Sequence, residues 1–141
     1  MKKADRQKVF DKYSGRCAYC GCELMKGWHV DEIEPVERGV KYLTDEQGNR
    51  LRKENGDHLT KAYMKYPERI TLSNQNPACA SCNIQKHSQS LETFREQVAQ
   101  FIESLNKYHS IYRFAKRYGL VQETGIPVVF YFEKVNSEPL K

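Results

Sequence analysis

Two Cys-x-x-Cys pairs constrain the fold of this chain more than any other feature of its sequence. Cys17 and Cys20 form the first pair, and Cys79 and Cys82 form the second, with residues 21–78 between them. Each pair can place two thiolates on one ion, and two pairs complete the tetrahedral four-cysteine site that is typical of structural zinc. The long separation predicts that the ion ties together distant segments, with a complete structural unit folded between them.

The rest of the composition indicates one folded domain in a reducing compartment. The chain has 141 residues, of which 39% are hydrophobic and 29% are charged, and this size suits a single modest core. No apolar run approaches the roughly 20 residues that cross a bilayer, and no apolar stretch follows the N-terminal lysines, so we expect a cytoplasmic protein. Disulfides are rare there. The fifth cysteine, Cys22, is a small buried residue, an exposed thiol or a substitute for Cys20.

The charge of the chain is compatible with a polyanionic partner. Its net charge is +5, which is a moderate excess and no proof of such a partner. Basic residues gather in the first sixteen positions and again at Arg113, Lys116 and Arg117. Each cluster is either a solvated helix face or a contact to nucleic acid.

The first half of the sequence predicts a helix, a strand and an insertion. Residues 4–14 have the pattern of a short amphipathic helix, and "WHVDEIEP" alternates as a strand does. Residues 38–68 are polar and contain two glycine turn signals, which predicts an inserted loop or hairpin. A short helix is expected near residues 59–65.

The second half is expected to be mainly helical. The stretch "RITLSNQNPACASCNIQKH" predicts a short strand, a turn and a helix opened by the second cysteine pair. Ser90 is a plausible N-cap for a helix whose apolar residues recur every three or four positions up to Tyr108. A shorter helix is expected over residues 110–119, and "PVVFYFEKV" predicts a closing β segment. The fold class is therefore α+β.

Taken together, "CAYC", "HVDEIEP" and "SNQNPACASCNIQKH" resemble the HNH family of ββα-metal endonucleases in its zinc-bound, four-cysteine form. The resemblance implies an antiparallel hairpin packed on one helix, with a divalent cation between them. It covers about residues 9–90, with the insertion at about 38–68. The C-terminal extension, about 91–141, resembles a tail found on some phage-type HNH proteins. We expect one HNH nuclease domain over residues 1–141.

The resemblance assigns roles to five residues of the motifs. It implies that Asp31 and Asn83 bind a catalytic Mg²⁺ or Mn²⁺, and that the Asn74 amide pins the hairpin loop and orients the general base. It places Lys86 near the scissile phosphate, and His87 shares a helix face with Asn83, as a third ligand or a phosphate contact. Oxygen ligands suit such hard cations, while an imidazole favours softer ones.

Each role has a simpler structural alternative. Asp31 could be a surface strand residue, Asn83 could merely begin a helix, and Asn74 could belong to a plain turn. Lys86 and His87 could be solvated helix residues.

Glu32 departs from the family pattern, which has a histidine at this position as the general base. A glutamate has a reference pKa of about 4.3 against about 6.5 for histidine, so it is the weaker base at neutral pH. Glu32 is a working base in a divergent enzyme, the mark of a natural loss of activity, or an introduced substitution that silences a toxic nuclease. The otherwise complete constellation favours the third explanation.

The function implied by the resemblance is metal-dependent hydrolysis of phosphodiester bonds in DNA, by nicking or by cutting both strands. We expect double-stranded DNA as the partner, with the helix of Asn83 and Lys86 against the minor groove. The N-terminal helix, the insertion and the basic C-terminal cluster would hold the backbone through residues that include Arg38, Lys41, Arg50, Arg52, Lys53, Arg113, Lys116 and Arg117. The alternatives are a non-catalytic zinc-stabilised nucleic-acid-binding module and an interaction domain that exposes the aromatic segment 130–132.

Overall fold

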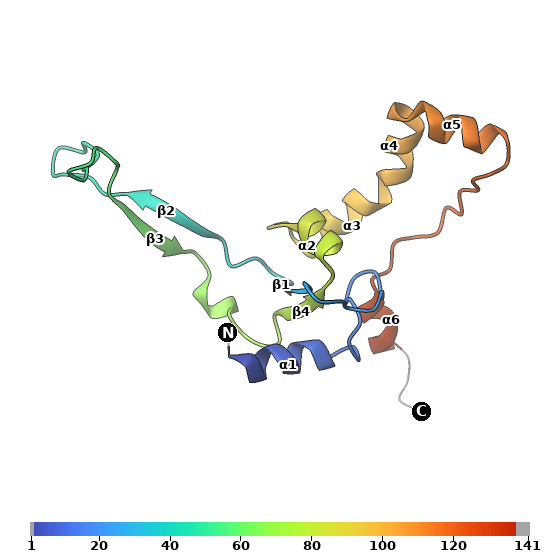
Figure 1. Cartoon of the computed structure of the whole chain (residues 1–141), viewed down its shortest axis with the longest axis horizontal. Helices are drawn as coiled ribbons and strands as arrows, with labels where there is room; N and C mark the ends of the chain where they lie inside the picture. The colour runs from blue at the N-terminus through green and yellow to red at the C-terminus, as the bar shows by residue number, and fades with distance from the viewer. Residues whose placement is uncertain (1, 138–141) are drawn as a thin grey trace.

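The computed structural model, which describes residues 2–137, is a mixed α+β fold with two small antiparallel sheets (Figure 1). A central body carries an arm, residues 38–64, and a helical extension, residues 91–117, which project in different directions (Figure 1). The body is built from five elements: α1 (Lys3–Asp11), β1 (His29–Glu32), β4 (Gln75–Ala78), α2 (Ala80–Lys86) and α6 (Tyr131–Ser137).

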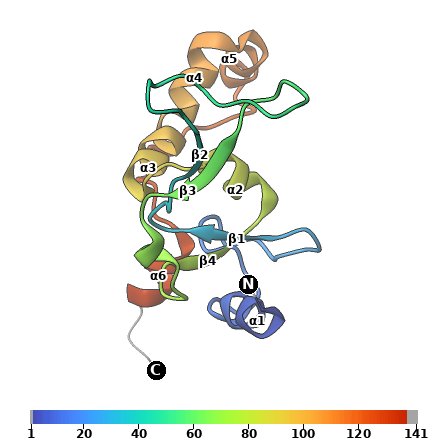
Figure 2. The same cartoon turned by 90° about the vertical axis from the view of Figure 1, so that its left-hand side faces the viewer.

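The β1–β4 pair forms the middle of the body. The two strands are antiparallel, and Asp31 lies opposite Asn76. Helix α1 packs against β4 and helix α2 packs against both strands, so the sheet lies between the two helices (Figures 1 and 2). Cys79 directly follows the strand and caps α2, because its Sγ accepts a hydrogen bond from the Cys82 amide. The second cysteine pair therefore sits at the junction between strand and helix.

The inserted segment is a hairpin, the arm. Its stem pairs β2 (Arg38–Tyr42) with β3 (Thr60–Met64). The helix expected near residues 59–65 is wrong, because cross-strand hydrogen bonds to β2 hold that segment extended. The strand expected before the second cysteine pair is present as Gln75–Ala78, where β1 provides a partner, but the turn comes before it rather than after it: a 3₁₀ turn, η1 (Pro67–Arg69), and bends lead into the strand.

The tip of the arm, residues 43–59, closes on itself. The backbone amide of Leu43 donates to the Leu59 carbonyl, Leu51 donates to Leu43, and Leu59 donates to Leu51, each at 2.9 Å. These three leucines are spaced eight residues apart, and a turn with a glycine at positive φ, Gly48 or Gly56, lies between each successive pair. The result is a ring of three mutually bonded segments.

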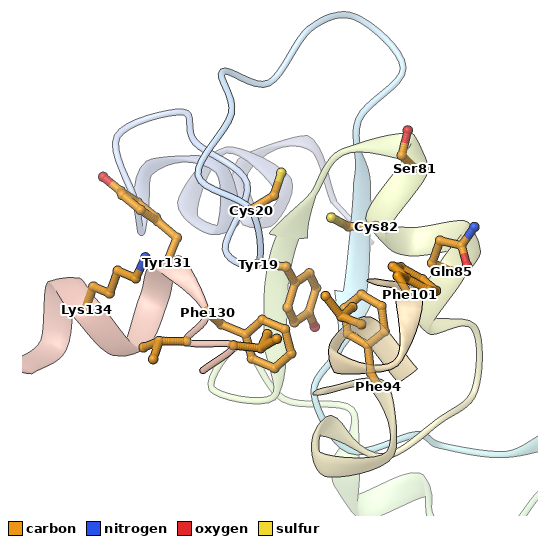
Figure 3. Close-up of a pocket in the computed structure, with 13 residues that line it drawn as sticks. Tyr19, Cys20, Ser81, Cys82, Gln85, Phe94, Phe101, Phe130, Tyr131 and Lys134 are labelled. Atoms are coloured by element: carbon orange, nitrogen blue, oxygen red, sulfur yellow. The ribbon is translucent and has the colours of Figure 1, made fainter. Parts of the chain in front are cut away.

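The apolar core joins the first cysteine turn to the C-terminal half. Tyr19, Phe94 and Phe130 are buried together, with ring centroids 5.4 to 5.6 Å apart. Figure 3 shows these rings gathered below Cys20 and Cys82, so the core lies directly against the cysteine cluster. Burial of aromatic side chains is a large source of stability in a chain of this size.

The C-terminal extension is helical as expected, but it is broken. Helix α3 (Leu91–Ala99) begins at Ser90, whose side chain accepts a hydrogen bond from the Thr93 amide, so the predicted N-cap is confirmed. Gln100 then separates α3 from α4 (Phe101–Tyr108), although no proline or glycine marks the break. Helix α5 (Ser110–Arg117) follows where the shorter helix was expected.

The prediction of a closing β segment is wrong, because Tyr131–Ser137 form α6. The Glu133 side chain accepts a hydrogen bond from the Phe130 amide at 2.8 Å, which is half of a capping box. Phe130 is buried in the core and Phe132 packs against that core. The aromatic segment is therefore no exposed strand edge. Within residues 2–137, every helix is too short or too polar to cross a bilayer.

Candidate functional site

The four paired cysteines meet at one point, as their spacing predicts. The Sγ atoms of Cys17, Cys20, Cys79 and Cys82 all lie within 4.8 Å of one another. The Sγ atoms of Cys20 and Cys79 are 3.8 Å apart, and a tetrahedron with Zn–S bonds of about 2.3 Å has edges of about 3.8 Å. The donor set and its spacing therefore fit a metal ion such as zinc.

Close packing shifts the pKa values of the thiols in opposite directions: the hydrogen bond to Cys17 raises the pKa of Cys82, and burial raises the pKa of Cys20. The Cys82 thiol, followed by the backbone amides of nearby residues, holds the pKa of Cys17 well below its usual range despite its burial. The turn that carries the first pair is closed by a hydrogen bond of 2.9 Å from the Gly21 amide to the Cys17 carbonyl. Gly21 has a φ of +76° there, a conformation that glycine adopts without strain.

Cys22 is exposed and lies outside the four-cysteine group. Desolvation and the neighbouring Cys20 and Cys79 thiols raise its pKa to about 12. The spare thiol is therefore neither buried nor a substitute for Cys20.

A separate cavity of about 300 Å³ lies beside the C-terminal end of β1 and the end of α2. Four of the residues with expected catalytic roles line it: Asp31, Glu32, Asn83 and His87. Arg38 lines it as well. The structure thus brings the strand carboxylate and the helix amide to the same cavity, while the thiolate cluster anchors the start of the helix.

The Asp31 carboxylate is held in place by two buried side chains, Tyr19 and Lys86. Its Oδ2 atom accepts a hydrogen bond from the Tyr19 hydroxyl and lies 3.0 Å from Nζ of Lys86. Oδ1 has no partner among the described residues. Burial raises the pKa of Asp31, while Tyr19 and Lys86 act in the opposite direction. This is the arrangement that fixes the orientation of a ligating carboxylate.

Lys86 does not have the place expected of a phosphate contact. Its side chain is fully buried, and Nζ donates to the Glu32 carbonyl at 2.6 Å in addition to its pair with Asp31. The side chain lies on the face of α2 that packs on the sheet, and the pairing compensates its buried charge. The alternative of a solvated helix residue is therefore wrong, whereas the expected contact of Lys86 with DNA stays a prediction that this burial disfavours.

Glu32 is engaged in a second ion pair. Its Oε1 lies 2.6 Å from an Arg38 nitrogen, and its Oε2 accepts from the other guanidinium nitrogen at 3.1 Å and from the Val36 amide at 3.2 Å. Desolvation would raise the pKa of Glu32, but the hydrogen bonds from Arg38 and Val36 outweigh it and lower the pKa. Glu32 is therefore a weak proton acceptor in this state.

Asn74 joins the two ends of the loop that follows β1. Its Oδ1 accepts from the Glu34 amide at 2.9 Å, and its Nδ2 donates to the carbonyls of Glu34 and Arg69 at 2.8 and 2.9 Å. The Ile33 amide donates to the Asn74 carbonyl. This bridging geometry is what a loop-pinning role requires, and it holds the backbone directly after Glu32.

His87 lies where α2 ends. It is exposed, has a φ of +48°, which is unusual for a non-glycine residue, and its Nδ1 lies 3.0 Å from the Ser88 hydroxyl. His87 is the C-cap of α2 and lies outside the helix, so it does not share a helix face with Asn83 as expected, although both residues line the cavity.

Two residues of the site escaped the sequence analysis. Tyr19 lies inside "CAYC", and its position between two thiol ligands gave no sign that its hydroxyl would reach Asp31. Asn76 is fully buried opposite Asp31, and its Nδ2 has no hydrogen-bond partner among the described residues. A polar residue in a short buried strand was the available signal for Asn76.

The basic C-terminal cluster is largely used inside the protein. Arg113 donates to the carbonyls of Asn106 and Lys107, and Lys116 forms an ion pair of 2.8 Å with Glu123. Arg117 lies over the Phe114 ring, 5.6 Å from its centroid. The contacts of Arg113 and Lys116 tie α5 to neighbouring segments, which weakens the expectation that the cluster serves DNA binding.

Comparison with protein-family models, with curated proteins and with solved structures gives no match.

Proposed function

We propose that the chain is a metal-dependent DNA endonuclease of the HNH type, held together by structural zinc at the four cysteines. The observation that carries the proposal is the shared cavity, which Asp31 from β1, Asn83 from α2 and the C-cap residue His87 all line. The antiparallel β1–β4 pair packed on α2 supports it, because the resemblance implies that arrangement around a cation.

Zinc is the metal proposed for the cysteine cluster because the donor set is four thiolates in a closed group. Such sites are structural rather than catalytic, since no position stays open for water. The cluster connects the turn after α1 with the start of α2. It would thereby fix the position of α2, and with it Asn83 and His87, relative to β1.

Asp31, Asn83 and His87 would hold the second cation, which supplies Lewis-acid stabilisation of the phosphate charge when bound. Tyr19 and Lys86 occupy Oδ2 of Asp31, so Oδ1 would be the atom available to hold a cation. Asn74 holds the loop after Glu32. The positive charge of Lys86 also reduces the net charge at Asp31, so we expect weak cation binding.

Glu32 takes the position of the general base. Its pairing with Arg38 and its lowered pKa support slow hydrolysis or none by the present chain. A divergent working base, a natural loss of activity and an introduced silencing substitution all remain compatible with this geometry.

The second candidate is a non-catalytic, zinc-stabilised nucleic-acid-binding module. One observation favours it: the Lys86 ammonium already balances the Asp31 carboxylate, so the site is electrostatically complete without a divalent cation.

Titration with Mn²⁺ of protein loaded with one zinc per chain separates the two candidates. The nuclease proposal expects one further Mn²⁺ site that the Asp31→Asn substitution abolishes. It also expects Mn²⁺-dependent plasmid cleavage by the Glu32→His variant, which supplies a histidine as general base. Absence of any second metal site in the unaltered protein would favour the binding module. Glu34→Gln removes an exposed carboxylate that does not line the cavity, and it serves as the matched control.

A further inference from the structure

The arm exposes both of its faces. Every residue of β3 and four of the five residues of β2 are exposed. An isolated two-stranded ribbon is only marginally stable in water, because it lacks a covered face. The arm also stands clear of the body in Figure 1. We therefore expect the arm to be covered by a partner when the protein is in a complex.

The two faces of the stem have different chemistry. The register places Lys41 directly opposite Lys61 and Gly39 directly opposite Tyr63. Side chains alternate along a strand, so Lys41, Lys61 and Tyr63 share one face, which we call the lysine face. The Tyr63 ring covers Gly39, where a Cβ atom would come within 2.7 Å of it, and Nζ of Lys41 lies 4.8 Å from the ring centroid.

The opposed lysines have no acidic partner. Neither Lys41 nor Lys61 forms an ion pair with any described residue. Like charges directly opposite each other destabilise an antiparallel pair. A polyanion bound across this face would remove the repulsion between the two lysines. The positive charge of the lysine face therefore favours a negatively charged partner.

The tip of the arm lacks this character. Its acidic residues, Asp45, Glu46, Glu54 and Asp57, outnumber its arginines and lysine, Arg50, Arg52 and Lys53. Arg50 lies over the Tyr42 ring at 4.1 Å, and Arg52 donates to the Gly56 carbonyl. The stem rather than the tip is therefore the cationic part of the arm.

We propose that the lysine face binds the phosphate backbone of duplex DNA that flanks the cavity, an inference that rests on the proposed function. Arg38 both lines the cavity and begins β2, so the stem leads directly away from the site. Lys41 is the third residue after Arg38 on β2, so it lies about 10 Å further along the strand, which is about a third of a helical turn of duplex DNA. The lysine face accordingly contacts phosphates a few base pairs from the bond at the cavity.

The test measures binding of a fluorescent duplex oligonucleotide by anisotropy across salt concentrations, without divalent cations so that cleavage cannot contribute. Lys41→Gln/Lys61→Gln is expected to lower affinity on the order of tenfold and to reduce the slope of log K against log salt by about 2. Lys26→Gln/Lys107→Gln removes the same net charge elsewhere and is expected to match the unaltered protein. Lys41→Arg/Lys61→Arg is expected to restore binding, which distinguishes charge from folding.

The outcomes separate the two proposals. If the unaltered protein binds the duplex and the Lys41→Gln/Lys61→Gln variant matches the charge control, the arm inference is overturned and the proposed function stands. If the unaltered protein fails to bind duplex at low salt, both are overturned. A loss of affinity for single-stranded RNA alone, with duplex binding retained, also overturns the arm inference.

Discussion

Nζ of Lys86 lies 3.0 Å from Oδ2 of Asp31, with the lysine fully buried and the carboxylate only 6% exposed. This pair links the end of α2 to β1, the two elements that line the cavity. Breaking a buried pair by removing one partner is costly, because the remaining charge stays desolvated. The pair therefore contributes both to the fold and to the charge of the site.

Lys86→Met is expected to destabilise the protein by about 3–5 kcal/mol, because the Asp31 carboxylate loses its counter-charge. Under the proposed function, Mn²⁺ should replace part of that charge and raise the Tm of Lys86→Met more than that of the unaltered protein. Thermal unfolding with and without Mn²⁺ measures both effects. Asp31→Asn/Lys86→Met should recover stability and lose the Mn²⁺ response; an equal Mn²⁺ shift in all three proteins would contradict the assignment of Asp31.

The cysteine cluster predicts one tightly held zinc per chain. Cys79→Ser should lose the metal and lower the Tm sharply, since binding at a structural zinc site contributes directly to folding. Cys22→Ser is the matched control, because Cys22 is close to the cluster but outside it. Metal content by mass spectrometry and unfolding in chelator test this; retention of zinc by Cys79→Ser would argue against a four-thiolate site.

Glu32→His should raise Mg²⁺- or Mn²⁺-dependent plasmid cleavage by about 10²–10⁴-fold, the range that a positioned general base contributes. Histidine also leaves Arg38 without its partner, so Arg38 becomes available to a phosphate. Glu32→Gln removes the Glu32–Arg38 ion pair without supplying a base and should stay inactive. Equal cleavage rates for the Glu32→His and Glu32→Gln variants would contradict the assignment of position 32 as the general base.

Asn74→Ala should cost about 2 kcal/mol of stability, because the Glu34 amide and two carbonyls lose a polar partner. Urea unfolding measures this. Ser73→Ala, one residue earlier, removes only an exposed contact to the Thr71 hydroxyl and should have a small effect. Similar losses in the two variants would mean that the loop does not depend on Asn74.

The decrease in the free energy of unfolding at acid pH should depend on Glu133. Hydrogen bonds from Arg95 hold its pKa below the ordinary value of 4.5. Its folded-state pKa is therefore lower than its unfolded-state pKa, so the stabilisation is present above about pH 4.5 and is lost as the pH falls through the folded-state pKa. Glu133→Gln should flatten the pH dependence of unfolding in this window, and Glu92→Gln, whose partner is also Arg95 but whose carboxylate is more exposed, should change it less.

The sequence predicted well where a local chemical signal was strong. The spacing of Cys17, Cys20, Cys79 and Cys82 predicted their convergence, because two Cys-x-x-Cys pairs in turns are typical of a four-thiolate metal site. Ser90 predicted its helix start through side-chain capping. Asp31, Asn83 and His87 reach one cavity, which the motif resemblance anticipated.

Prediction failed where tertiary contacts override local preference. Residues 60–64 include good helix formers, yet pairing with β2 holds them extended. The apolar run before Glu133 has β character, yet burial of Phe130 and the cap from Glu133 begin a helix there. Lys86 looked like a surface residue because sequence cannot show that its ammonium meets a buried carboxylate 55 positions away.

The backbone hydrogen bonds among Leu43, Leu51 and Leu59 make the three segments at the far end of the arm depend on one another. Deleting a single octapeptide would open the ring and orphan a backbone donor and acceptor, whereas replacing residues 43–59 as a whole by a two-residue turn would leave the β2–β3 register intact. Changes in arm length should therefore be tolerated only as a complete excision or exchange of this piece.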